Sequence, residues 1–103
     1  MPVHMYGQPC EMRKIKKIAK QNNLKIIEDA AQAPGVNEGD QAVGAIGDIG
    51  RITLNYHKHI HTGEGGMLVT NDDAIAEKCR LIRNHGENLF DVKDIADSVN
   101  VIG

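Results

Sequence analysis

The chain has 103 residues, which is enough for one domain at most. Its formal net charge of −2, from 12 basic and 14 acidic residues, lacks the basic surplus of a nucleic-acid-binding protein. Its apolar runs are far shorter than the ~20 residues that span a bilayer, and its N-terminus has no secretory signal pattern. We therefore expect a cytoplasmic protein that binds neither nucleic acid nor membrane.

The first predicted element is an amphipathic helix over residues 10–22. Its apolar side chains recur at the spacing of one helix face, at Met12, Ile15, Ile18 and Ala19. A short apolar strand over residues 24–27 follows and leads into Glu28 and Asp29. A helix that leads into an apolar strand is typical of an α/β fold, in which helices cover both faces of a parallel sheet.

Glycine, proline and aspartate are frequent between residues 30 and 50, which predicts loops and turns without a regular element. Residues 51–56 and 67–70 have the composition of strands. The glycine-rich turn at residues 63–66 lies between them, so we expect the two strands to pair as a hairpin-like ribbon.

A second helix is predicted to start at Asp72 or Asp73, because an aspartate before a helix can accept hydrogen bonds from the first N–H groups. Its apolar face continues to about Arg83. Gly86 is well placed to end this helix in the left-handed conformation. The remaining residues, 87–103, mix apolar and acidic side chains without a clear period.

Three residues are candidates for chemistry. Asp29 follows a predicted strand, at the edge where open α/β sheets bind ligands, and an acid there could pair with the ring nitrogen of a cofactor. Lys58 precedes the glycine-rich turn and could serve as an amine nucleophile. Thr53 lies five residues before Lys58. Isolated charged residues are usually solvated surface residues, so these positions alone leave their roles open.

The histidines around Lys58 suggest a different class of site. His57, His59 and His61 alternate, so on a strand they would project from one face and could bind a transition metal. No Asp, Glu or Cys nearby completes a familiar ligand spacing. A histidine-based metal-binding module is therefore an alternative hypothesis.

Five segments, in the same order, resemble motifs of the DegT/DnrJ/EryC1/StrS aminotransferases, a fold-type I family that uses pyridoxal phosphate (PLP). They are residues 2–9 (PVHMYGQP), 28–33 (EDAAQA), 47–50 (GDIG), 58–66 (KHIHTGEGG) and 83–86 (RNHG). The resemblance implies an α/β fold with a mostly parallel sheet flanked by helices. Residues 1–103 would form a truncated part of the PLP-binding large domain, and the small C-terminal domain would be absent.

The resemblance also implies a role for each candidate residue. Lys58 would form a Schiff base with PLP and move a proton during transamination. Asp29 would face the pyridine nitrogen and keep it protonated, since a pyridinium ring accepts electrons better than a neutral one. Gln32 would face the 3-hydroxyl oxygen of the ring, and Thr53 would bind the phosphate where the family usually has a serine. A dehydratase branch of the family has histidine at the position of Lys58, so the lysine favours transamination.

The activity implied by the family is transfer of an amino group from glutamate or glutamine to a nucleotide-linked keto-sugar. This reaction would serve the synthesis of amino sugars of surface polysaccharides or antibiotics, in a full-length protein that is a homodimer. Family members are several times longer than 103 residues, so we expect this chain to be inactive by itself. A non-catalytic family remnant or a regulatory relative stays open as a further alternative.

Overall fold

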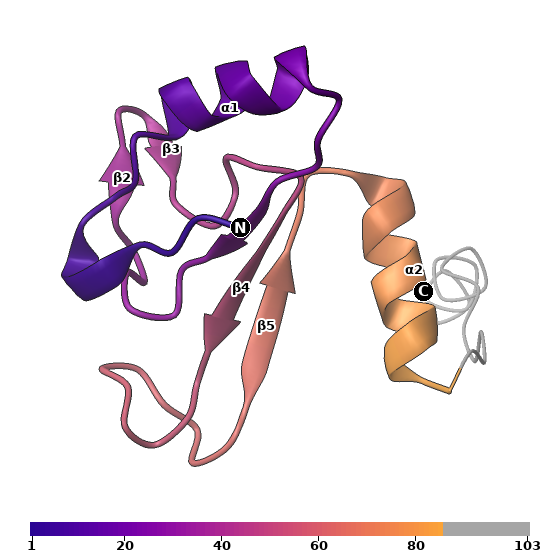
Figure 1. Cartoon of the computed structure of the whole chain (residues 1–103). Helices are drawn as coiled ribbons and strands as arrows, with labels where there is room; N and C mark the ends of the chain where they lie inside the picture. Colours follow the sequence, from indigo (N-terminus) through magenta and orange to yellow (C-terminus); the bar gives the residue numbers. More distant parts are fainter. Residues whose placement is uncertain (86–103) are drawn as a thin grey trace, which may run out of the picture.

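The computed structural model describes residues 1–85 of the chain. The elements in this range are η1 (Met5–Gly7), α1 (Met12–Gln21), β1 (Ile27–Asp29), β2 (Asn37–Glu38), β3 (Gln41–Ala42), β4 (Ile49–Thr53), β5 (Gly66–Val69) and α2 (Asp73–Arg83). Figure 1 shows α1 above β1 and the β2–β3 hairpin, and α2 beside β5 of the sheet that contains β1, β4 and β5. The predicted α/β class is confirmed, with the five strands lying between α1 and α2 along the chain.

The three-stranded sheet is mixed rather than purely parallel. β1 and β4 run parallel, with Asp29 opposite Arg51. β4 and β5 run antiparallel, which confirms the predicted hairpin-like ribbon. The strand predicted at residues 24–27 is shifted, because β1 begins at Ile27 and includes the two acidic residues after it. β4 likewise begins earlier than predicted, at Ile49, because this residue pairs with Ile27.

The prediction that residues 30–50 contain no regular element was wrong. β2 and β3 lie in this range and form a small antiparallel hairpin. The first two residues of β4 also lie between residues 30 and 50. Gly39 stands between β2 and β3 with a φ of +66°, a conformation that glycine adopts without strain. Strands of two residues each are too short to leave a period in the sequence, so composition alone could not reveal them.

α1 covers one face of the sheet, and the core lies beneath it. The buried side chains of this core are Met12, Ala19, Ile26, Ala30, Ala33, Val43 and Ile46. The carboxylate of Glu38, on the β2–β3 hairpin, accepts a hydrogen bond of 3.0 Å from the N–H of Met12 at the start of the helix. This contact satisfies an N–H group that the helix itself leaves free, and it joins the hairpin to α1. The helix predicted over residues 10–22 is confirmed.

The start of α2 is also confirmed. The Asp72 side chain accepts hydrogen bonds from the N–H groups of Ala74 and Ile75, as an N-cap does. The helix ends at Arg83, as predicted, and His85 adopts the left-handed conformation with a φ of 59°. The cap predicted at Gly86 and the segment 87–103 lie outside the described residues. Among residues 1–85, no helix is long and apolar enough to cross a membrane.

A single aspartate ties the start of β1 to the turn before β4. Asp48 accepts hydrogen bonds of 2.7 Å from the Ile26 N–H and 2.9 Å from the Lys25 ammonium. We expect Asp48→Ala to lower the free energy of unfolding by about 1–2 kcal/mol, because the Ile26 N–H loses its acceptor. Replacing Lys25, which is 80% exposed, by alanine should lower it far less, because solvent screens the charge of this side chain. Urea unfolding measures both values, and equal losses would contradict the assignment to the backbone contact.

The same contacts make the contribution of Asp48 to the free energy of unfolding depend on pH. The Ile26 N–H, and after it the Lys25 ammonium, hold the pKa of Asp48 below its ordinary value of 3.8. Because the folded state favours the ionised carboxylate, this stabilisation is present above pH 3.8 and is lost as the pH falls below it. The difference in stability between the wild-type chain and Asp48→Ala should therefore shrink on acidification.

Candidate functional site

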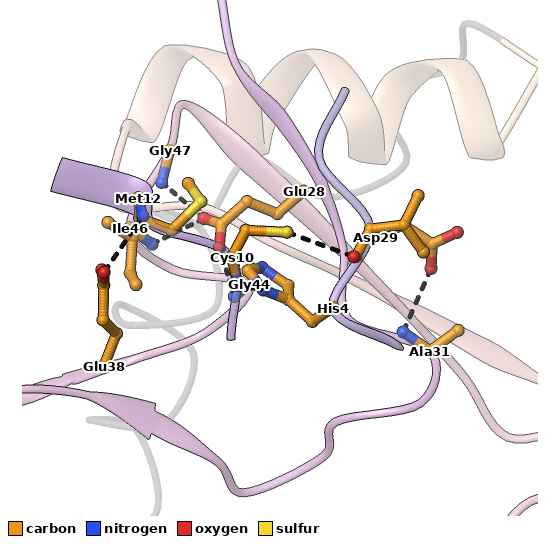
Figure 2. A network of polar contacts seen from close by, with 11 residues as sticks. His4, Cys10, Met12, Glu28, Asp29, Ala31, Glu38, Gly44, Ile46 and Gly47 are labelled. Atoms are coloured by element: carbon orange, nitrogen blue, oxygen red, sulfur yellow. Dashed lines mark hydrogen bonds and ion pairs between the residues drawn. The ribbon is translucent and has the colours of Figure 1, made fainter. Parts of the chain in front are cut away.

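Consecutive residues of a strand point to opposite faces of a sheet. Glu28 and Asp29 are consecutive in β1, so their carboxylates lie on opposite faces. Glu28 is fully buried on the side of α1, and Asp29 points away from it (Figure 2). The two carboxylates therefore face different surroundings, although they are adjacent in the sequence. Glu28 belongs to the interior, while Asp29 lies at the carboxyl end of β1.

The Glu28 carboxylate accepts four hydrogen bonds. Three come from backbone N–H groups of one turn, at Gly44 (2.8 Å), Ile46 (2.7 Å) and Gly47 (2.5 Å). The fourth comes from the Nε2 atom of His4, at 2.9 Å. Figure 2 shows these donors around the carboxylate. A buried carboxylate needs this number of donors, because desolvation of an unpaired charge is very costly.

His4 fixes the first residues of the chain beside β1. Its Nδ1 atom accepts a hydrogen bond of 3.1 Å from the Cys10 N–H, so the ring proton is assigned to Nε2, where it is donated to Glu28. The His4 N–H also donates to the carbonyl of Asp29, and the Asp29 N–H donates to the carbonyl of Pro2. These backbone bonds hold Asp29 from the side opposite to β4.

Asp29 keeps its charge through two different partners. Its Oδ1 atom accepts a hydrogen bond of 3.1 Å from the Ala31 N–H, and its Oδ2 atom lies 2.5 Å from the guanidinium of Arg51. The Arg51 hydrogen bond is the largest influence that lowers the pKa of Asp29, followed by the Ala31 hydrogen bond and the positive charges of Arg51 and Lys58. Partial burial opposes these effects without cancelling them. Asp29 is therefore a carboxylate at neutral pH.

Lys58 lies half-buried in the loop after β4. Its N–H donates a hydrogen bond of 2.9 Å to the carbonyl of Asn55. The side-chain amide of Asn55 donates in turn to both oxygens of Glu64, at 3.0 Å each, and this closes the loop across its base. Because the charge of Lys58 lowers the pKa of Asp29, the loop brings the lysine into electrostatic range of the carboxylate.

Thr53 and Gln32 are close in the chain to residues that contact Asp29. Thr53 is the last residue of β4, two positions after Arg51, which faces Asp29. It therefore lies on the same face, about 6–7 Å further along the strand. Gln32 lies in the turn after β1, where its Oε1 atom accepts a hydrogen bond of 3.0 Å from the Tyr6 N–H. The amide nitrogen of Gln32 is thereby oriented away from this contact and is a hydrogen-bond donor.

A groove of about 750 Å³ runs along this face, between the β4–β5 ribbon and α2. Arg51 and Thr53 line it from the sheet, and Arg80 and Arg83 line it from the helix. The guanidinium of Arg51 is already paired with Asp29. Arg80, Arg83 and the Thr53 hydroxyl are therefore the groups of this groove that are suited to an anionic ligand such as a phosphate. Of the four candidate residues, only Thr53 lines this groove; Asp29, Gln32 and Lys58 are not among its lining residues.

These residues suit the chemistry of PLP. Asp29 offers an ionised carboxylate for a pyridinium N–H, Gln32 offers an amide donor, and Thr53 offers a hydroxyl at the edge of a positively charged groove. Lys58 offers the amine that an aldehyde requires. The set of donors and acceptors thus fits a ring with a nitrogen at one end and a phosphate at the other.

The histidine interpretation finds no support in the structure. His57, His59 and His61 are exposed and lie in the loop after β4, so their alternation does not place them on one face of a strand. In the described part of the chain, no three His, Cys, Asp or Glu side chains lie close enough together to hold a metal ion.

Four residues of this region were missed by sequence reasoning. They are His4, Glu28, Arg51 and Tyr6. The N–H of Tyr6 orients Gln32, and Tyr6 adopts the left-handed conformation with a φ of 53°. Glu28 carried a weak signal, because a charged residue that directly follows an apolar run is a candidate for a buried position. The role of Arg51 depends on the register of β1 against β4, which the sequence alone does not determine.

The chain is similar to known proteins in both sequence and structure. A model of the DegT/DnrJ/EryC1/StrS aminotransferase family matches residues 1–99. The GDP-perosamine synthase of Caulobacter vibrioides is 48% identical over 84% of this chain and 23% of its own length. The X-ray structure of an aminotransferase from Psychrobacter cryohalolentis superposes with a TM-score of 0.81 and 40% identity, over 84% of this chain and 22% of that one.

A third similar structure is that of the E. coli GDP-4-keto-6-deoxy-D-mannose-3-dehydratase with bound hydrated PLP. It is 32% identical, with a TM-score of 0.75, over 82% of this chain and 22% of that one. The chain spans less than a quarter of the length of these three proteins. Its described residues have the α/β fold of the corresponding part of these solved structures. This chain belongs to the DegT/DnrJ/EryC1/StrS aminotransferase family.

Proposed function

We propose that this chain is part of a PLP-dependent aminotransferase that acts on a nucleotide-linked keto-sugar. The observation that carries the proposal is the arrangement around Asp29, a carboxylate at the end of β1 that is held by the Ala31 N–H and by Arg51, and whose pKa the charge of Lys58 also lowers. Relatives named for amino-sugar synthesis, such as the GDP-perosamine synthase of Caulobacter vibrioides, support the substrate class. Residues 1–103 would belong to the large, PLP-binding domain.

Each candidate residue has a defined task in this proposal. When bound, PLP supplies a ring that accepts electrons from the carbon whose proton is removed. The Asp29 carboxylate would accept the hydrogen bond of the ring N–H and hold that proton in place. The amide nitrogen of Gln32 would donate to the 3-oxygen, and the Thr53 hydroxyl would donate to the phosphate. The Nζ atom of Lys58 would bind the cofactor covalently and carry the proton that transamination moves.

Lys58 provides the most direct test. We expect the 103-residue chain, mixed with PLP and reduced with sodium borohydride, to carry a saturable adduct at Lys58. Borohydride makes a bond between a lysine amine and an aldehyde permanent, so peptide mass spectrometry can locate the adduct. Lys58→Ala should lose it completely. We expect no amino transfer to a nucleoside-diphosphate keto-sugar by residues 1–103 alone, because they span less than a quarter of the relatives' length.

The matched control for this test is Lys20→Ala, which removes an exposed lysine from α1 and leaves the loop after β4 unchanged. This variant should keep the adduct at Lys58 with the same saturation. An adduct spread evenly over surface lysines, and unchanged in Lys58→Ala, would contradict the proposed role of Lys58. Turnover by the 103-residue chain would contradict its inactivity in isolation.

The second candidate function is that of a dehydratase, because one of the similar structures is a sugar 3-dehydratase. The family resemblance assigns histidine to the position of Lys58 in that branch, so the lysine of this chain supports transamination instead. The glutamate or glutamine donor, the homodimer and the cytoplasmic location are also proposals that follow from the family. A regulatory, non-catalytic relative would be indicated by the absence of any adduct at Lys58.

A further inference from the structure

The two oxygens of Asp29 are held in different ways. The Oδ1 atom accepts a hydrogen bond from the Ala31 N–H, which is a fixed part of the turn after β1 (Figure 2). The Oδ2 atom is paired with Arg51, whose side chain is 56% exposed, whereas that of Asp29 is only 10% exposed. The arginine therefore lies between the carboxylate and the solvent. Any ligand that reaches Oδ2 from outside meets the guanidinium first.

The sheet fixes the backbone of Arg51, whereas its side chain is held by the ion pair with Asp29 and is 56% exposed. Arg51 is paired with Asp29 in the parallel register of β4 against β1, and its carbonyl accepts a hydrogen bond of 3.0 Å from the Ala30 N–H. The guanidinium is attached to this fixed point by a long, flexible stem. Since Arg51 also lines the groove towards α2, the side chain has space into which it can swing.

We infer that Arg51 is the resident counterion of Asp29 in the cofactor-free chain, and that a pyridinium ring must displace its guanidinium to reach the carboxylate. This inference rests on the proposed function, because it takes Asp29 as the partner of the ring nitrogen. Two cations on one carboxylate repel each other, so the arginine opposes binding of the ring. Arg51 thus tunes how tightly the cofactor is held, without touching the reacting atoms.

The test uses pyridoxine 5′-phosphate, which has the ring and the phosphate but no aldehyde. This probe cannot attach to Lys58, so its affinity reports recognition of the ring separately from covalent binding. We expect Arg51→Met, which keeps the apolar stem and removes the charge, to bind the probe about tenfold more tightly in a fluorescence titration, equivalent to about 1.4 kcal/mol. Arg13→Met makes the same change of net charge on the exposed side of α1 and should leave the affinity unchanged.

A double-mutant cycle separates competition at Asp29 from a general charge effect. In an Asp29→Asn background the carboxylate is gone, so Arg51→Met should no longer tighten binding of the probe. A second measurement needs no ligand. In a carbon-13 NMR titration, Arg51→Met should raise the pKa of Asp29 towards its ordinary value, because the hydrogen bond that lowers it most is removed.

Unchanged or weaker affinity of Arg51→Met would overturn the inference, and so would an equal gain in the Asp29→Asn background. If the Lys58 adduct still forms in those cases, the proposed function stands and the role of Arg51 alone fails. If no variant binds the probe and no adduct forms at Lys58, the proposed function and the inference fail together.

Discussion

Replacing Glu28 by glutamine is expected to lower the free energy of unfolding by about 2–6 kcal/mol, because two buried donors would each lose their acceptor at a cost of about 1–3 kcal/mol. The carboxylate accepts four hydrogen bonds through two oxygens, and both oxygens are used. A glutamine has one oxygen, and its NH₂ group would face N–H donors that have no other acceptor. Because Glu28 has no exposure to solvent, water cannot replace the lost contacts.

The matched control for Glu28 is Glu38→Gln on the β2–β3 hairpin. Glu38 uses one oxygen to accept from the Met12 N–H, and a glutamine keeps that oxygen. We expect this variant to lose less than about 1 kcal/mol. Urea unfolding followed by circular dichroism compares the two substitutions on the same chain. Similar small losses in both would show that the Glu28 network contributes little to stability.

The second large effect is expected at Gly50, the second residue of β4. A Cβ atom at this position would lie 1.9 Å from the carbonyl oxygen of Gly44, so the backbone of one residue must move. Gly44 belongs to the turn that donates to Glu28, and a shift there would also lengthen that hydrogen bond. We expect Gly50→Ala to lower the free energy of unfolding by about 3 kcal/mol, at the upper end of the cost of overpacking.

Gly66→Ala provides the comparison for Gly50, because both glycines lie in strands of the same sheet. The added Cβ would lie 3.3 Å from the carbonyl oxygen of Ile52, a tight distance that a small adjustment relieves. We expect a loss below about 1 kcal/mol in the same urea experiment. If Gly50→Ala proved as mild as Gly66→Ala, the turn at residues 44–47 would not be held against β4 as tightly as the structure indicates.

Gly44 and Gly50 show why glycine is needed between residues 30 and 50. The number of glycines predicted loops and turns, and the prediction missed β2, β3 and the start of β4, which this range also contains. Gly50 lies inside a strand because the backbone of Gly44 crosses it at close range. Gly44 adopts a φ of +92° so that its N–H can reach Glu28. Gly44, Gly47 and Gly50 therefore allow the turn to bind the buried carboxylate of Glu28, which no local pattern in the sequence predicts.

The sequence by itself determined the features that depend on neighbours along the chain. The spacing of Met12 and Ala19 predicted α1, and Asp72 predicted the start of α2, because helix faces and caps are set within a few residues. The turn at residues 63–66 predicted the β4–β5 ribbon. The ordered motifs also led to the family, whereas the individual roles of Asp29, Gln32, Thr53 and Lys58 stay predictions.

The tertiary structure decided what depends on residues distant in the chain. Whether Glu28 or Asp29 faced the interior followed from the exact start of β1, since a shift of one residue exchanges the two faces of a strand. The pairing of Asp29 with Arg51, 22 residues later, followed from the parallel register of β1 and β4. Register is set by the packing of the whole sheet, so neither the buried network around Glu28 nor the counterion of Asp29 could be predicted from local sequence.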